Sequence, residues 1–157
     1  MNKKFDYRAS IILGMHDAIV SLTGLIAGLG LAFQNKTFIV LSCIIASITA
    51  SLSMGAANYL AVKTTNKQHA TTAALCTGGA YMMTCILLIF PFFILNDRTL
   101  TLCAVFLMAL SIIFLFNLFF YKNQKFYKNF SEMVIICTLV SVISFVIGYG
   151  AKYFFGV

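Results

Sequence analysis

Five long apolar segments dominate this chain of 157 residues and limit what it can fold into. A helix needs roughly 20 consecutive, mostly apolar residues to cross the hydrocarbon core of a membrane. The segments that meet this requirement are residues 10–33, 38–62, 72–95, 100–121 and 130–153. With 61% hydrophobic and only 10% charged residues, the composition excludes a disordered chain and an ordinary soluble domain. The sequence therefore predicts an all-α integral membrane protein, with five transmembrane helices in a single domain over residues 1–157.

The basic residues fall mainly on one side of this predicted bundle. If the N-terminus is cytoplasmic, eight Lys or Arg residues lie on the cytoplasmic side and three on the opposite side. The eight are Lys3, Lys4, Arg8, Lys63, Lys67, Lys122, Lys125 and Lys128, and the three are Lys36, Arg98 and Lys152. Because basic loops stay in the cytoplasm, we predict a cytoplasmic N-terminus and a C-terminus outside. Contact of these basic loops with anionic lipid headgroups explains the net charge of +7 without nucleic-acid binding. The charge pattern fits a bacterial plasma membrane or an organellar membrane.

One carboxylate, Asp17, interrupts the first apolar segment. A charged side chain inside a membrane is costly unless it has a partner, a proton or a wet cavity, and it generally marks a functional site. Counted at 1.5 Å per residue, Asp17 lies roughly 10 Å, Met54 roughly 12 Å and Asn58 roughly 6 Å below the same membrane surface. The first two spans are antiparallel neighbours, so we expect these three side chains to approach one another.

The chemistry of this trio suits a transition-metal ion. A carboxylate and an amide supply oxygen ligands, and a thioether favours cations softer than Mg²⁺ or Ca²⁺. Incomplete ligation also suits transport, because the ion must leave again. Asp17 could alternate between a proton and a metal ion. The neighbouring His16 projects about 100° away around the helix, so we expect it to pack or to reach a polar neighbour rather than to bind the ion.

Small and weakly polar residues follow one face of the first, second and fifth segments. The three sets are Asp17, Ser21, Gly24 and Gly28; Ser47, Ser51, Met54 and Asn58; and Cys137, Ser141, Ser144 and Gly148. Helices in membranes use such stripes for close contacts or to line a pathway. One interpretation makes Ser21, Gly24 and Ser51 pathway-lining residues, and the other makes the stripes plain helix contacts. The bulky fourth segment is expected to face lipid.

The sequence has no feature that indicates an enzyme. It contains no paired carboxylates, no nucleophile with an adjacent base and no Cys-rich cofactor motif. The five cysteines are scattered over different segments without a C-x-x-C pair, so a disulfide framework or a zinc site is not expected. We therefore expect no resident cofactor, and a metal ion as substrate.

Four motifs resemble the vacuolar iron transporter family, also called the CCC1-like family. Residues 14–21 (GMHDAIVS) are similar to the signature of its first helix, and residues 53–62 (SMGAANYLAV) to that of its second. Residues 79–92, which end in Phe-Pro-Phe, resemble its third helix. The fifth helix is matched by Glu132-Met133 at its start and by residues 144–148 (SFVIG) near its end. The resemblance covers nearly the whole chain, in order.

The resemblance implies a function as well as a fold. Members of the family export Fe²⁺, and often Mn²⁺, from the cytosol in exchange for protons, and they are homodimers with the pathway near the subunit interface. On this resemblance Asp17 and Met54 correspond to pathway positions, and with Asn58 they form the predicted metal site. Glu132 corresponds to an acidic position of the family at the cytoplasmic end of the fifth helix, and we predict it as a proton or entry site; the alternative interpretation is a carboxylate at a helix start.

Two departures from the family pattern bear on this function. Asn58 stands where the second-helix motif has a glutamate, which removes a charge from the pathway. Residues 63–71 are too few for the Glu-rich metal-binding domain that some members insert there. These departures leave metal preference and proton coupling open. They also support an alternative function, a structural or regulatory membrane subunit of the same descent that no longer transports.

Overall fold

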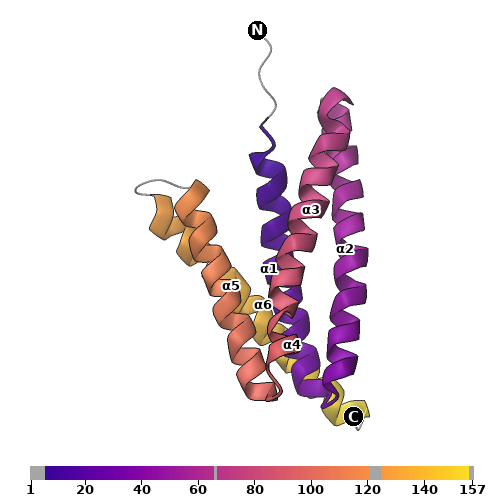
Figure 1. The fold of residues 1–157 in the computed structure, drawn as a ribbon, viewed down its shortest axis with the longest axis vertical. Helices are drawn as coiled ribbons and strands as arrows, with labels where there is room; N and C mark the ends of the chain where they lie inside the picture. The colour runs from indigo at the N-terminus through magenta and orange to yellow at the C-terminus, as the bar shows by residue number, and fades with distance from the viewer. Residues whose placement is uncertain (1–5, 66, 121–124, 156–157) are drawn as a thin grey trace.

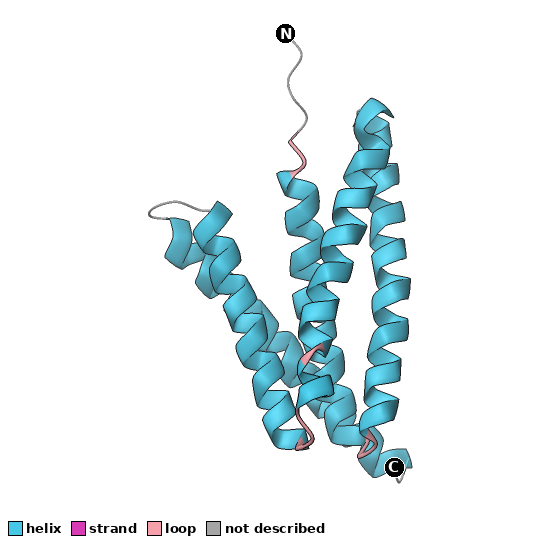
Figure 2. Ribbon diagram, in the orientation of Figure 1, coloured by secondary structure: helices cyan, strands magenta, loops and turns pink. Residues whose placement is uncertain are grey.

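The computed structural model describes residues 6–65, 67–120 and 125–155, and over these ranges it shows helices and short loops without a strand (Figure 2). The helices are α1 (Arg8–Ala32), α2 (Lys36–Thr65), the 3-10 turn η1 (Lys67–His69), α3 (Ala70–Ile89), α4 (Pro91–Ile94), α5 (Arg98–Phe120) and α6 (Lys125–Phe155). Within the described residues, five helical stretches are long and apolar enough to cross a membrane, with η1, α3 and α4 together forming the third. The predicted all-α, five-helix architecture is confirmed. The predicted end of the fourth segment, Tyr121, lies outside the described residues.

Asparagine and aspartate side chains begin two of the helices. The Asn35 Oδ1 accepts hydrogen bonds from the backbone N–H groups of Thr37 (2.9 Å) and Phe38 (3.3 Å). The Asp97 Oδ1 accepts one from the backbone N–H of Leu100 at 3.0 Å. Such side chains satisfy N–H groups that have no partner within a helix, so these short loops start α2 and α5 where polar residues interrupt the apolar pattern.

Pro91 divides the third span, which the sequence predicted as continuous over residues 72–95. Proline lacks a backbone N–H and collides with the preceding turn, so α3 ends at Ile89 and Pro91 opens the short helix α4. The end of α4 is tied to the start of α2, because the Lys36 Nζ donates to the Leu95 carbonyl at 2.7 Å.

Helix α1 occupies the centre of the bundle and contacts α2, α3, α5 and α6. Figure 1 shows α2 and α3 side by side on one flank of α1 and α5 on the other, while α6 starts beside α5 and crosses behind the bundle to end below α2. The α5–α6 pair diverges from α1 toward the end of the molecule where α1 begins (Figure 1). The start of α1 and the end of α6 lie at opposite ends of the bundle, as an odd number of spans requires.

The small-residue stripes lie at two helix contacts. A Cβ added to Gly148 of α6 would collide with the carbonyl oxygen of Gly28 in α1, and one added to Gly24 would lie 3.0 Å from the Ser144 hydroxyl. On the other flank, a Cβ on Gly78 of α3 would lie 2.9 Å from the Ser51 carbonyl of α2. Apolar burial does not drive association in lipid, so such close backbone approach is a main source of stability here.

Helix α5 buries a single stripe and exposes most of its other side chains. The buried residues are Thr101, Val105, Ala109, Ile113, Phe116 and Asn117. The expected lipid-facing surface is present on the rest of the helix, which includes Leu107, Phe114 and Phe119. The contact stripe could not be distinguished in the sequence, because bulky apolar residues occupy both sides of the helix.

The basic residues separate by end of the bundle. Arg8, Lys63, Lys67, Lys125 and Lys128 belong to helix ends on the side where α1 begins, and Lys36, Arg98 and Lys152 to helix ends on the opposite side. Lys3, Lys4 and Lys122 lie outside the described residues. Which end faces the cytoplasm stays a prediction from the charge count.

Candidate functional site

Asp17 lies in the first half of α1, about 14 Å from the first residue of the helix, Arg8. Its side chain is exposed on the surface of the single chain. Among the described residues, the ion pairs join Arg8 to Asp6 and Lys128 to Glu132, and neither involves Asp17. A carboxylate at this depth requires a bound cation, a proton or cover from another chain.

Ser21 and Tyr81 form the polar contact closest to Asp17 along α1. The Ser21 hydroxyl lies 2.7 Å from the Tyr81 hydroxyl of α3, and either group can donate the hydrogen bond. Ser21 is one helical turn from Asp17, and the carboxylate is near enough to interact electrostatically with both Tyr81 and Cys85. Sequence reasoning missed Tyr81, because a single tyrosine in an apolar segment has no spacing signal.

Asn58 is a hydrogen-bonding centre that joins three helices. Its Nδ2 donates to the Ser10 Oγ of α1 at 3.0 Å and to the Thr77 Oγ1 of α3 at 2.6 Å. The Ala73 carbonyl lies 3.2 Å from the same nitrogen. The Thr77 hydroxyl in turn donates to the Ser10 carbonyl at 3.0 Å. The amide group of Asn58 is therefore used to hold α1, α2 and α3 together.

The contact with Ser10 places Asn58 about two helical turns, or about 10 Å, from the level of Asp17. The depth count from the sequence assumed that the facing helices end at one surface. In the structure α2 continues for seven residues past Asn58, whereas α1 begins two residues before Ser10. The structure thus brings Asn58 to Ser10 rather than to Asp17, and its role as a metal ligand stays a prediction.

Replacing Asn58 with Leu is expected to lower the free energy of unfolding by about 1–2 kcal/mol, because Ser10 and Thr77 lose their shared donor. Thermal unfolding in detergent measures the change. The control is Thr64→Ala, since the exposed Thr64 hydroxyl donates only to the Ala61 carbonyl of its own helix. Equal stability of the two variants would contradict a structural role for Asn58.

Met54 and Ser51 precede Asn58 along α2 by about one and two helical turns. Met54 is half-buried and packs against the hydrophobic core. Ser51 is buried, and its hydroxyl donates to the Ile48 carbonyl at 2.9 Å. Ser51 lies at the α2–α3 contact and Gly24 at the α1–α6 contact, as the helix-contact interpretation of the stripes predicts. The pathway-lining role of Ser21, Gly24 and Ser51 stays a prediction.

Glu132 lies on the exposed surface of α6, in its second turn. Its Oε1 is 4.0 Å from the Nζ of Lys128, one turn earlier in the helix. Exposed pairs of this spacing contribute a few tenths of a kcal/mol. Glu132 is accessible to solvent or headgroups at the end of the bundle where α1 begins, and its role in admitting protons or metal ions stays a prediction.

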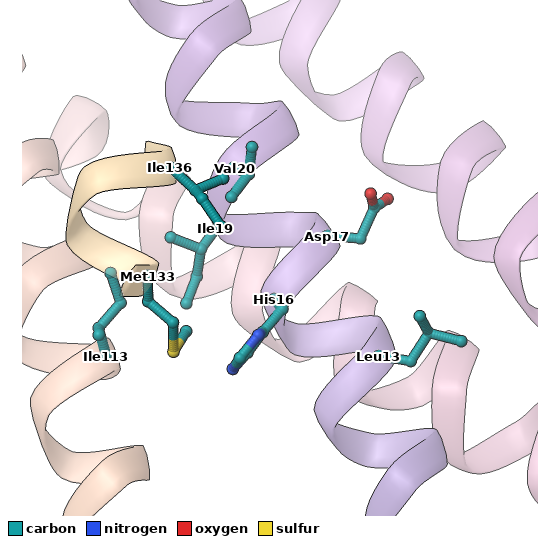
Figure 3. A pocket seen from close by; sticks show the side chains of 8 residues that line it. All are labelled: Leu13, His16, Asp17, Ile19, Val20, Ile113, Met133 and Ile136. Carbon is teal, nitrogen blue, oxygen red and sulfur yellow. The ribbon is translucent and has the colours of Figure 1, made fainter. Parts of the chain in front are cut away.

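A cavity of about 300 Å³ lies between α1, α5 and α6 (Figure 3). Its lining consists of Leu13, His16, Asp17, Ile19 and Val20 of α1, Ile113 of α5, and Met133 and Ile136 of α6. Figure 3 shows His16 on the side of α1 that faces Met133, and the Asp17 carboxylate on the other side. The predicted divergence of His16 from Asp17 is confirmed.

The ligands available for a metal ion near Asp17 are mainly neutral. The described residues contain no group of three or more His, Cys, Asp or Glu side chains that could hold one ion together. A single chain thus offers a cation at Asp17 one carboxylate, and the remaining ligands must be neutral groups or water. Such a set binds weakly, which suits passage of an ion more than its storage.

Comparison with known families and proteins extends this picture. The model of the VIT family matches residues 8–71, a stretch that covers α1, α2 and the turn into α3 and includes Asp17, Met54 and Asn58. The match is consistent with a VIT or CCC1-like family member. No curated protein matches the chain.

Proposed function

We propose that this chain, whose residues 8–71 match the model of the VIT family, exports Fe²⁺, Mn²⁺ or both from the cytosol in exchange for protons. The family match suggests a metal-ion transporter, and the five apolar helices suggest a multi-pass membrane protein. The observation that carries the proposal is Asp17, a carboxylate about 14 Å inside a spanning helix without a cationic partner among the described residues.

Asp17 is the charge-bearing ligand in this proposal. With metal bound, the carboxylate is ionised and the cation neutralises it; without metal, a proton does so. Either state removes the cost of a bare charge in the membrane, so the two cations compete for one group. Met54 provides a thioether that favours transition metals over Ca²⁺.

The proposal also includes a homodimer. Asp17 is exposed in the single chain, and a carboxylate facing lipid is unfavourable. A two-fold contact presents the same surface from both chains, so a dimer seam along this face of α1 covers Asp17 and brings it near its counterpart. The two carboxylates would then compensate for the small number of charged ligands in each chain.

Reconstituted liposomes test the proposal. Purified protein is inserted into vesicles that contain a fluorescent Fe²⁺ chelator, and quenching is followed with and without a pH gradient. Uptake that exceeds that of protein-free vesicles and increases with the gradient is expected. Absence of uptake by a folded dimer would instead favour the non-transporting membrane subunit.

Replacing Met54 with Ala is expected to lower the ratio of Fe²⁺ to Ca²⁺ flux by about tenfold, because the site loses its soft ligand. Parallel uptake assays with the two ions measure the ratio. Met83→Ala is the matched control, since Met83 is an exposed methionine of α3. An unchanged flux ratio in Met54→Ala would show that the Met54 thioether is not a ligand at this site.

A further inference from the structure

Two buried polar atoms beside the α1–α5–α6 cavity have no hydrogen-bond partner among the described residues. They are the Nε2 of His16 in α1 and the Oδ1 of Asn117 in α5. A buried polar atom without a partner costs about 1–3 kcal/mol, so each calls for an occupant or a function. Asp17 also lines this cavity, but its carboxylate points to the side of α1 away from His16 and Met133 (Figure 3).

A thioether sulfur lies at the same place. Met133 of α6 lines the cavity together with His16, and Figure 3 shows the two side chains on one side of α1. The Asn117 Nδ2 lies 3.5 Å from the Met133 Sδ, so the amide positions the sulfur. The imidazole is held edge-to-face against Phe116, with ring centroids 5.3 Å apart and planes at 75°. Both side chains are therefore oriented by neighbours on α5.

We propose that His16 Nε2 and Met133 Sδ bind a transition-metal ion in this cavity, as a second site at the depth of Asp17. Imidazole nitrogen and thioether sulfur are ligands of borderline and soft cations, whereas Mg²⁺ and Ca²⁺ require oxygen ligands. The cavity of about 300 Å³ has room for an ion and several waters, each of which occupies about 30 Å³. The inference rests on the proposed function only for the identity of the ion.

A site with two protein ligands and several waters binds an ion weakly and reversibly. The His16 imidazole and the Met133 thioether are both neutral ligands, so binding there does not require a carboxylate to lose a proton. The second site therefore differs from the Asp17 site in its response to cations. Excess Mg²⁺ competes for a carboxylate but not for an imidazole–thioether pair.

Equilibrium binding of Fe²⁺ under anaerobic conditions, with the full chain in detergent, tests the proposal. The Asp17→Asn/Met54→Leu double variant removes the first site, and it is expected to retain about one Fe²⁺ per chain in the presence of excess Mg²⁺. Adding Met133→Leu, or His16→Phe, is expected to abolish this binding. Adding Met108→Leu is the matched control, since Met108 of α5 is also half-buried against the core. X-ray absorption at the iron edge should show a sulfur neighbour that disappears with Met133→Leu.

The variants are chosen to keep the fold. Met133→Leu nearly conserves volume, and His16→Phe retains a ring against Phe116. Thermal unfolding identifies any variant that has lost its structure. If either Met133→Leu or His16→Phe is unfolded, the binding measured with the other one tests the site. No Fe²⁺ on the double variant, or binding unchanged by both Met133→Leu and His16→Phe, would overturn the second site. Retained binding in a protein that shows no vesicle uptake would sustain the second site and reject transport.

Discussion

Asp17→Asn is expected to reduce Fe²⁺ uptake by proteoliposomes to the level of protein-free vesicles. Asparagine keeps the size of the side chain but cannot carry the negative charge that attracts a divalent ion or exchange a proton for it. The helix should form normally, because the Asp17 side chain is exposed and has no ion-pair partner among the described residues. The measurement is chelator quenching in vesicles, with and without a pH gradient.

Asp6→Asn is the matched control for the same change of group. Asp6 is also exposed, and its carboxylate lies 3.9 Å from Arg8, before α1 begins. This variant should transport at the wild-type rate. Size-exclusion chromatography with light scattering checks that both variants keep the oligomeric state of the wild type. Normal flux through Asp17→Asn would remove the central claim of the proposed function.

Gly14→Ala is expected to lower the free energy of unfolding by about 1–3 kcal/mol or more, because its Cβ would collide with the Thr77 carbonyl of α3. The obstacle is backbone rather than a flexible side chain, so α1 and α3 must separate. The same separation stretches the hydrogen bonds that join Ser10, Asn58 and Thr77 one turn away. We therefore expect Gly14→Ala to lower stability more than any other added methyl group in this part of the chain.

Reaction of the cysteines with a fluorogenic thiol dye during heating measures this effect. Cys43, Cys85 and Cys137 are buried in the folded protein and react when it opens. Gly79→Ala is the control, since a Cβ there has nothing within 4 Å. Gly79→Ala should unfold at or slightly above the wild-type temperature, because alanine favours a helix over glycine. Equal unfolding temperatures for the two variants would contradict the close α1–α3 contact.

The helices could be predicted from the sequence because membrane spans require length and apolarity, which are properties of a segment alone. The break at Pro91 was visible as a residue, but whether proline bends a span or divides it depends on the neighbours that satisfy the freed carbonyls. The contact stripe of α5 was hidden, since lipid and protein interior select the same apolar residues.

The candidate site was only partly predictable. Asp17 stood out because a charge in a span is rare, and the structure places it in the interior of α1, in the first half of the helix. The level of Asn58 was misjudged, because counting residues from helix ends ignores how far α2 and α3 project past the start of α1. The contacts of Tyr81 and Met133 depend on which helices lie side by side, and a single sequence does not contain that information.

The backbones of α1 and α6 approach closely where Gly28 and Gly148 cross, so a rotation of one helix against the other would be centred at this point. At this point the two backbones touch, and toward the start of α1 the helices part. From Gly28 to the level of Asp17 the lever arm is about 16 Å, so a rotation of about 10° about the crossing shifts α6 by about 3 Å there. Such a rotation would widen or narrow the cavity beside His16 by about one water diameter, with little change at the glycine contact.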